Sequence, residues 1–389
     1  MFVAEVKEHL VKDIIPFWQE LRDDVYGGFY GYMGHDLALH EKAVKGCILN
    51  SRILWFFSNA YLLLKEERLL EDAKHAFQFL KEHCMDRENG GVYWSLAYDG
   101  KPEDTTKHTY NQAFAIYALS SYYDASGDEL ALELAKGLYG IIETKCKDEY
   151  GYLEAFNIRF EPEDNDKLSE NGVMAEKTMN TLLHVFEAYT ELYRVSGDEK
   201  VADNIRYMLD LVADRVYNAS AGRQEVFFDR TWHTLIDLYS YGHDIEAAWL
   251  IDRGLEVLGD ASYSEKISPI TRTITDNIYK RAYKNESLAN EAENGVVDTT
   301  RIWWVQAEAV VGFLNGYQKN PGHREYLEAA KAIWNYIKDY QIDKRCHEWH
   351  WAVDEERRPL EKPLVDPWKC PYHNGRMCFE VIRRMSDVT

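Results

Sequence analysis

The sequence has few positive charges for its size. It holds 45 Lys and Arg residues against 66 Asp and Glu residues, which gives a formal net charge of −21. A protein that binds a phosphate backbone needs a basic patch, and none is visible, so we expect neither nucleic acid nor an anionic membrane as a partner. Carboxylates concentrate in residues 161–166 and 286–298. These two runs are either solvated loops or acidic lids over a binding site.

Cysteines and long apolar runs are also scarce. The six cysteines lack the density of a disulfide framework for a chain of 389 residues. No uninterrupted apolar run approaches the ~18 residues of a membrane span. Residues 1–10 contain three charged residues and no apolar stretch typical of a signal peptide. We therefore expect a protein of the reduced cytoplasm.

Glycine-rich phosphate loops are missing as well. The sequence contains no G-x-G-x-x-G, no Walker sequence and no G-x-S-x-G, so nothing implies a nucleotide or a flavin. What the chain has in abundance is aromatic residues: 27 Tyr, 15 Phe and 11 Trp. Much of this must be core. Trp and Tyr also offer flat apolar faces with a polar edge, which suit sugar rings.

Two kinds of helix pattern alternate along the chain. Strongly apolar patterns cover residues 49–64, 110–123, 176–193, 241–258, 300–317 and 376–385, and polar-faced patterns cover residues 3–22, 67–84, 128–145, 198–216 and 325–340. Residues 262–284 are the least clear. A helix that is apolar nearly all round must be buried, and a polar-faced helix belongs outside it. The alternation predicts an all-α (α/α)6 barrel, with an open superhelix of helix pairs as the structural alternative.

No linker rich in Pro, Gly or Ser divides the chain. A length of 389 residues exceeds the usual size of a single core, but in a closed repeat each unit packs only on its neighbours. We therefore expect one catalytic domain over residues 1–389. Short glycine-aromatic pieces at residues 90–94, 150–152 and 349–351 predict small strands or turns in the connecting loops rather than a real sheet.

Each apolar helix pattern opens with polar side chains that are capable of chemistry. The leading residues are spaced 58 to 70 residues apart, and the six openings carry Arg52, Tyr110, Asn180 with His184, His243 with Glu246, Trp304 with Glu308, and His373. If the barrel is right, the six inner helices run parallel and their N-terminal ends share one rim. The spacing therefore predicts that these residues converge on a single site, where unpaired helix N–H groups favour developing negative charge.

Two histidines are the best candidates for proton transfer. His243 and Glu246 are three residues apart on one helix face, and a carboxylate near an imidazole can orient it and adjust its pKa. His373 sits at a tight helix start between Pro371 and Gly375. Either histidine could instead be an ordinary core or surface residue. Because His243 and His373 lie on two different helices, one could remove a proton from one face of a substrate and the other could return a proton to the opposite face.

A metal site is the competing interpretation of these segments. Cys370, His373 and Cys378 are zinc-capable residue types, and Cys346, His347 and His350 lie nearby. No clean set of four ligands emerges. The two His-x-x-Glu pairs, at His184 and His243, lack the second histidine of the zincin motif. We therefore expect no metal.

The remaining openings have the character of a ligand site. Arg52 is a permanent cation that can hold an oxyanion. Asn180 and His184 share a helix face, although His184 could be a hydrogen-bonded core residue. Trp304 and Glu308 also share a face, and a Glu among so many apolar neighbours needs a partner, which could be a ligand, an Arg or a His.

Longer strings in the sequence resemble a known family. WWVQAEAVVGF at residues 303–313, KHTYNQAFAIY at 107–117, YGHDIE at 241–246 and WKCPYHNGRM at 368–377 are similar to the cellobiose 2-epimerases of the N-acylglucosamine 2-epimerase superfamily, and the likeness extends from residues 15–18 onward. The resemblance implies an (α/α)6 barrel without metal or organic cofactor. It implies reversible inversion at C2 of the reducing-end glucose in β-1,4-linked disaccharides, such as cellobiose or lactose, through a cis-enediolate.

Residue roles follow from the same resemblance. His243 and His373 would be the acid/base pair, with His373 on the C2 proton in the glucose direction and Glu246 as the partner of His243. Binding of the reducing-end sugar and its enediolate would fall to Arg52, Tyr110, Asn180 and His184, with Trp304 and Trp368 stacking on sugar and Trp249 and Glu308 in support.

Other functions stay open. They are an aldose–ketose isomerase, a monosaccharide or N-acylglucosamine 2-epimerase, a glycoside hydrolase that uses Glu246 and Glu308, and a non-catalytic sugar-binding protein. Cellobiose, lactose and mannobiose differ in parts far from C2, so all three stay candidate substrates, and we expect a monomer.

Overall fold

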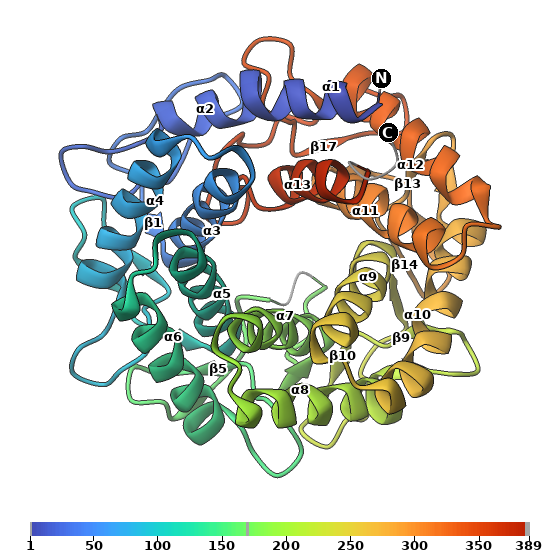
Figure 1. Ribbon diagram of the computed structural model, residues 1–389, viewed down its shortest axis with the longest axis horizontal. Coiled ribbons are helices and arrows are strands. Elements are labelled where there is room, and N and C mark those ends of the chain that lie inside the picture. Colours follow the sequence, from blue (N-terminus) through green and yellow to red (C-terminus); the bar gives the residue numbers. More distant parts are fainter. Residues whose placement is uncertain (1, 169–170, 386–389) are drawn as a thin grey trace.

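The computed structural model describes residues 2–168 and 171–385, and its helices form two concentric rings (Figure 1). The inner ring consists of α3 (Cys47–Leu64), α5 (Thr109–Ser126), α7 (Met179–Ser196), α9 (Tyr241–Leu258), α11 (Trp303–Lys319) and α13 (His373–Met385). Most side chains of these helices are buried, as the nearly continuous apolar patterns predict. The predicted bounds are right to within a few residues.

The outer ring carries the polar-faced helices. They are α1 (Phe2–His9) with α2 (Ile15–Glu20), α4 (Glu67–Phe79), α6 (Glu129–Ile141), α8 (Glu199–Leu211), α10 (Ala261–Arg281) and α12 (Arg324–Tyr336). Five of these units contain a π-helical turn, at Leu10–Ile14, Leu80–Cys84, Ile142–Cys146, Val212–Val216 and Ile337–Gln341. A π-helical turn inserts one residue and so rotates the helix face that follows it. The period of the apolar residues alone does not show this rotation.

The exception among the outer helices is the segment that the sequence left unclear. α10 runs without a π-helical turn and contains Pro269. It nevertheless buries a regular stripe made by Ile267, Thr271, Ile274 and Ile278. β-branched residues and proline are weak helix formers, so local propensity hides a helix that tertiary packing stabilises.

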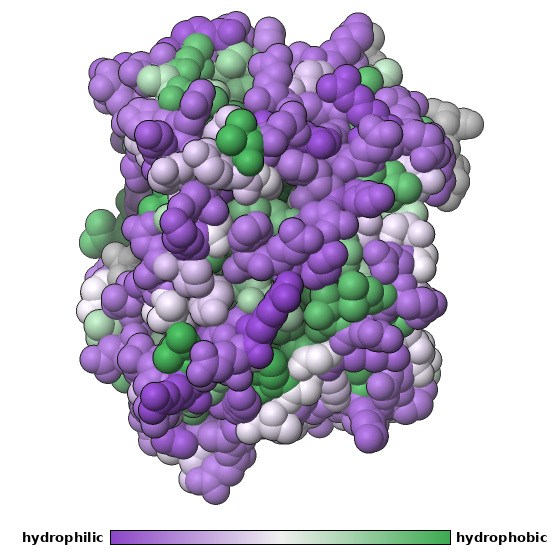
Figure 2. Space-filling view, turned by 90° about the vertical axis from the view of Figure 1, so that its left-hand side faces the viewer, coloured by the Kyte–Doolittle hydropathy of each residue, from purple (hydrophilic) through white to green (hydrophobic). Residues whose placement is uncertain are grey.

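The ring of inner helices is closed. Each inner helix contacts the next in chain order, and α13 contacts both α11 and α3. The open superhelix is therefore wrong, and the fold is the predicted (α/α)6 barrel. Figure 2 shows one outer side of the molecule, which is mostly hydrophilic with scattered apolar residues, as expected for amphipathic outer helices.

One inner helix also has the composition of a membrane span. α3 has a mean hydropathy of 1.3 over 18 residues. It passes that test by length and composition only, and 78% of the segment is buried inside the barrel. A core helix has the same character, because it is apolar on every side.

Short strands surround one end of the barrel. They are β1 (Lys45–Gly46), β2 (Ser95–Leu96), β3 (Pro102–Asp104), β4 (Lys107–His108), β5 (Ala155–Phe156), β6 (Pro162–Glu163), β7 (Lys177–Thr178), β8 (Tyr217–Asn218), β9 (Arg223–Gln224), β10 (Phe227–Phe228), β11 (Leu238–Ser240), β12 (Tyr283–Lys284), β13 (Ser287–Leu288), β14 (Glu291–Glu293), β15 (Val296–Asp298), β16 (Arg301–Ile302) and β17 (Ala352–Val353). β1, β4, β7, β11 and β16 each lead directly into an inner helix. Each pairs with a strand of the following loop, so these pairs set where the inner helices begin.

Buried lysines anchor several of these starts. Lys45 bonds Asp23 at 2.6 Å, Lys107 bonds Asp86 at 2.9 Å, and Lys177 bonds Asp148 at 3.0 Å. The three lysine side chains are fully buried. Each aspartate lies in the loop that follows the preceding outer helix. These ion pairs therefore tie the loops to the inner helices. Lys369 and Glu348 form an equivalent pair before α13, at 3.0 Å.

Candidate active site

A cavity of about 380 Å³ lies at the N-terminal ends of the inner helices. Its volume is in the range of small-molecule sites. Nine of the eleven predicted site residues line it: Arg52, Tyr110, Asn180, His184, His243, Glu246, Trp304, Trp368 and His373. They come from all six inner helices and from the loop before α13. Each of the six openings thus contributes at least one side chain to this cavity.

Loops complete the mouth of this cavity. Lys167 and Asn171 line it from the loop before α7, and Glu291 and Asp298 line it from the strands β14 and β15. The side chain of Asn171 donates to Glu291 at 3.4 Å and thus joins the two walls. The acidic run at residues 286–298 therefore does reach the mouth. The run at 161–166 is mostly exposed, as a solvated loop would be.

His243 stands at the first turn of α9 and is partly exposed to the cavity. Its Nδ1 pairs with the Oγ of Ser240 at 2.7 Å, which leaves Nε2 as the ring nitrogen for a substrate. Burial, and to a lesser extent the nearby His184, lower the pKa of His243 to about 3. The imidazole is therefore neutral at pH 7 and can act as a base.

His373 opens α13 and faces the same cavity. Its Nδ1 pairs with the Oε1 of Glu308 at 2.7 Å, so Nε2 is again the free ring nitrogen. Burial and the cations Arg376 and Arg52 hold the pKa of His373 well below its usual range. The indole of Trp304 contacts both histidines, with ring centroids 4.7 Å from His243 and 5.5 Å from His373. The two neutral imidazoles therefore lie against one aromatic side chain.

Arg52 is a buried cation that lines the cavity. Its Nη2 donates to the phenol of Tyr110 at 2.8 Å, and its Nη1 donates to the carbonyl of Trp368 at 3.2 Å. The guanidinium is stacked between the rings of Phe114 at 4.1 Å and Tyr372 at 4.7 Å. These contacts hold it in one orientation, so its charge is organised before any anion forms.

His184 lies beside this cation in the second turn of α7. Its Nδ1 pairs with Glu187 Oε2 at 2.8 Å, and burial lowers its pKa. The Oδ1 of Asn180, which lines the cavity, is buried and has no hydrogen-bond partner among the described residues. Such an acceptor is costly unless a ligand or water completes it.

The structure changes the predicted partner of His243, and two predicted substrate-binding residues do not line the cavity. Glu246 does not pair with His243: its Oε1 bonds Arg376 of α13, and Ser240 takes its place beside His243. Trp249 and Glu308 do not line the cavity but lie beneath it. The indole N–H of Trp249 donates to Glu308 Oε2 at 2.9 Å, and Glu308 in turn supports His373.

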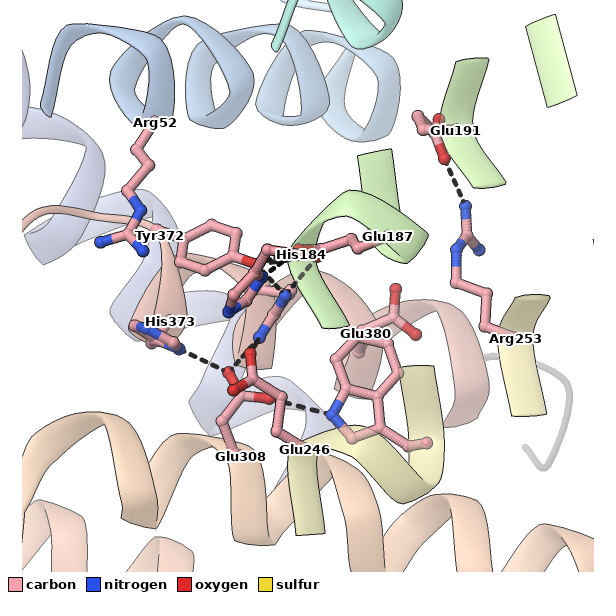
Figure 3. A network of polar contacts seen from close by, with 12 residues as sticks. Arg52, His184, Glu187, Glu191, Glu246, Arg253, Glu308, Tyr372, His373 and Glu380 are labelled. Atoms are coloured by element: carbon pink, nitrogen blue, oxygen red, sulfur yellow. Dashed lines mark hydrogen bonds and ion pairs between the residues drawn. The ribbon is translucent and has the colours of Figure 1, made fainter. Parts of the chain in front are cut away.

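Sequence reasoning missed the residues that hold together the network beneath the cavity, of which Tyr372 and the three glutamates are labelled in Figure 3. Arg376 bonds the carboxylates of Glu187, Glu246 and Glu308. Tyr372 donates to Glu187 at 2.7 Å. One signal was present in the sequence: Arg376 follows His373 by three residues in a buried helix, where an unpaired guanidinium would be costly.

Among the described residues, one group could hold a metal ion by geometry, and it is not the cysteine–histidine set that was weighed as the alternative. Ligand atoms of Glu246, Glu308 and His373 lie within 4.8 Å of one another. Both carboxylates bond the guanidinium of Arg376, which supplies a positive charge at that place. The six cysteines, Cys47, Cys84, Cys146, Cys346, Cys370 and Cys378, are all free thiols.

Comparison with known proteins identifies relatives of this chain. A family model described as N-acylglucosamine 2-epimerase matches residues 28–375. The chain is 53% identical to the cellobiose 2-epimerase of Ruminococcus albus over the whole of both chains, and 50% identical to that of Eubacterium cellulosolvens over 98% of each. A crystal structure of a sugar epimerase from a ruminal bacterium superposes with a TM-score of 0.97, at 52% identity over 99% of each chain.

Proposed function

Because the chain belongs to the N-acylglucosamine 2-epimerase family and is a carbohydrate epimerase, we propose that it inverts C2 of the reducing-end glucose in β-1,4-linked disaccharides. Cellobiose would become glucosyl-mannose, and lactose would become epilactose. The observation that carries the proposal is the pair His243 and His373: two neutral imidazoles in one cavity, each engaged at Nδ1. Relatives named cellobiose 2-epimerase, at 50% and 53% identity over almost the full length, support the substrate class.

The reaction begins with opening of the sugar ring, since the C2 hydrogen is acidic only beside an aldehyde. In this scheme His243 accepts the O1 proton and so becomes the acid for a later step. Glu246 would supply the proton for O5. Burial and the nearby Glu308 raise the pKa of Glu246, and its Oε2 has no partner within the described chain.

Proton transfer at carbon follows. His373 removes the C2 proton, and the imidazolium that results is stabilised by Glu308 on its Nδ1. The product is a cis-enediolate, whose charge Arg52 stabilises with the Tyr110 phenol nearby. Rotation about C2–C3 turns the other face toward His243, which returns a proton to C2. Ring closure, in which Glu246 takes back the O5 proton and His373 gives its proton to O1, then yields the mannose configuration and restores the starting protonation of both side chains.

The aromatic side chains around the cavity would hold the sugars. Trp304 and Trp368 are partly exposed and line the cavity, so their faces can stack on pyranose rings. Trp368 also lies against Tyr110 and Trp94, with ring centroids 6.1 and 5.6 Å away. Two aromatic faces in one cavity, those of Trp304 and Trp368, would suit a substrate of two linked sugars.

The geometry disfavours glycoside hydrolysis. That reaction needs two carboxyl groups that flank the scissile bond. Glu308 is fully buried beneath His373 and bonds Trp249, His373 and Arg376. It is therefore not placed to reach a glycosidic oxygen in the cavity.

The proposal is tested by incubation of cellobiose with the protein in deuterated water. We expect glucosyl-mannose with deuterium at C2, and a loss of at least about 100-fold in His243→Asn and His373→Asn. If both variants kept most activity, the two-histidine mechanism would be wrong. A ketose as the main product would indicate the aldose–ketose isomerase. Release of free glucose would indicate hydrolysis, and stoichiometric binding without turnover a sugar-binding protein.

The proposal extends to the assembly that performs the reaction. We propose that the whole chain acts as one catalytic domain, as a cytoplasmic monomer, and needs neither a metal ion nor an organic cofactor. Support for the last point comes from the chemistry itself, because neutral imidazoles and a fixed guanidinium supply the base and the anion stabilisation. Activity after exhaustive dialysis, with light scattering at assay concentration, checks these points.

A further inference from the structure

A single cation lies among three buried carboxylates beneath the cavity. Arg376 is 1% exposed and sits one turn after His373 on α13. Its Nη1 bonds Glu187 Oε1 at 2.5 Å, and its Nη2 bonds Glu308 Oε1 at 2.6 Å and also the carboxylate of Glu246. The guanidinium is packed over the rings of Tyr372 at 4.2 Å and Trp249 at 4.9 Å. It is therefore held in one place by packing and by charge.

Two of these carboxylates are the Nδ1 partners of cavity histidines. Glu187 pairs with His184 at 2.8 Å, and Glu308 pairs with His373 at 2.7 Å. The two glutamates, which are labelled in Figure 3, come from α7 and α11, and the guanidinium that joins them comes from α13. Arg376 thus connects two substrate-facing imidazoles through one carboxylate on each side.

Burial opposes charge on all three carboxylates. For Glu187 it would raise the pKa, but Arg376, His184 and Tyr372 together lower the pKa to about 2. For Glu308 burial raises the pKa even against the opposing effect of Arg376. Three close carboxylates without a cation cannot all stay ionised in such a place. Removal of the guanidinium would leave at least one of them protonated at neutral pH.

The protonation state of a carboxyl group decides which nitrogen of its histidine carries the proton. An ionised carboxylate only accepts, so it requires N–H at Nδ1 and leaves Nε2 with a lone pair. A protonated carboxyl group can donate to Nδ1, which then places the proton on Nε2. An imidazole with N–H toward the substrate cannot act as a base.

We propose that Arg376 is a positioning residue: it keeps Glu187 and Glu308 as hydrogen-bond acceptors, and thereby holds His184 and His373 with Nε2 as the free base. The kinetic part of this proposal rests on the proposed function, whereas the tautomer of His373 does not. The sequence signal is the same three-residue spacing between His373 and Arg376 that places both on one face of α13.

The decisive variant is Arg376→Met, which keeps an unbranched side chain and removes the charge. We expect kcat on cellobiose to fall at least about 100-fold at pH 7, with KM changed less than about threefold. We also expect kcat of the variant to increase with pH, because the carboxyl groups regain their acceptor role as they ionise above their raised pKa. A lost fold would instead lower kcat equally at all pH values.

Two further variants separate charge from packing. Arg376→Lys keeps the charge, but one ammonium cannot bond Glu187 and Glu308 as two guanidinium nitrogens do, so we expect about a tenfold loss and a wild-type pH profile. Arg383→Met is the matched control on the same helix. Arg383 is exposed and donates to Asn59 at 3.0 Å, away from the cavity. Its loss should leave kcat and KM unchanged.

The direct readout is nitrogen NMR of protein labelled at histidine, without substrate. The signals of His373 are identified by their absence in His373→Gln, and we expect a proton on Nδ1 in the native protein and on Nε2 in Arg376→Met at pH 7. The proposal is overturned if His373 keeps its tautomer in Arg376→Met. Full kcat in either Arg376 variant also overturns it, as does a loss in Arg376→Met that does not depend on pH. If Arg376→Met does not fold, by its melting curve, Arg376→Lys carries the test, and full activity there overturns it. Failure of the proposed function would instead appear as absent turnover in the native protein with the expected tautomer intact.

Discussion

The position of Trp249 provides a sharp test of how this cavity works. The resemblance to sugar epimerases suggested a residue that supports substrate binding, but the indole is 1% exposed and lies below the cavity. Its N–H donates to Glu308 Oε2 at 2.9 Å, and Glu308 Oε1 pairs with His373. Trp249→Phe keeps most of the buried ring and removes this donor. It therefore isolates one hydrogen bond in the support of the proposed base.

The size of the effect follows from the kind of bond that is lost. A hydrogen bond to a charged group contributes about 1.5–3 kcal/mol. Because about 1.4 kcal/mol corresponds to a factor of ten in rate, we expect kcat to fall about 10- to 150-fold if the loss is felt in the transition state. KM should change little, since the ring does not line the cavity.

The pH profile adds a second, independent expectation. Burial raises the pKa of Glu308, while hydrogen bonds from Arg376 and Trp249 lower it. Loss of the indole N–H therefore raises this pKa further. Glu308 acts as an acceptor only above its pKa, so the acid limb of the kcat profile should move to higher pH in Trp249→Phe.

The assay is steady-state epimerisation of cellobiose across pH, with deuterium uptake at C2 as a measure of the proton-transfer step. Trp334→Phe is the matched control, because Trp334 is equally buried but donates to Glu5 on the outside of the barrel at 3.2 Å. We expect a wild-type profile for the control. An increase in KM with unchanged kcat in Trp249→Phe would refute the reasoning and return Trp249 to a direct binding role.

Three further outcomes follow from buried groups. Lys107→Met leaves Asp86 buried without its cation. This should lower the free energy of unfolding by about 3–5 kcal/mol and Tm by roughly 4–6 °C at this chain length. The control Lys101→Met, on an exposed loop, should not change Tm. Burial raises the pKa of the Cys146 thiol to about 12 and that of Cys346 to about 11. The native thiols should therefore react slowly with a disulfide reagent at pH 8, and all six should react after unfolding. Rapid labelling of the native protein would contradict this. EDTA should not reduce turnover, because Arg376 supplies the positive charge between Glu246 and Glu308; a loss of activity that an added divalent metal restores would show the opposite.

Much of the fold could be predicted because the helices of the barrel follow the local spacing of apolar residues. Inner helices such as Tyr241–Leu258 begin and end where the apolar pattern does. α10 could not be predicted in this way, since Pro269 and β-branched residues conceal a stripe that only packing against α9 reveals. The π-helical turns of the outer helices also lack a local signature.

For the candidate site, the sequence predicted which residues line the cavity but not which partners they bond. The six helix openings identified eight residues that line one cavity, and the family resemblance added Trp368. The partner of each side chain was not predictable. Glu246 shares a helix face with His243 but bonds Arg376, which is 130 residues away in sequence. Ser240, three residues before His243, takes the expected place of the carboxylate.

By itself the sequence determined that apolar and polar-faced helices alternate, and that two histidines and an arginine stand where the apolar helices begin. Those properties depend on neighbours within a few residues, so the chain carries them wherever it folds. The tertiary structure alone decided that Glu308 and Trp249 act from beneath the cavity and that Arg376 joins three carboxylates. Which polar groups are buried together depends on how helices distant in sequence pack, and desolvation makes those partners set the charge and the free nitrogen of each histidine.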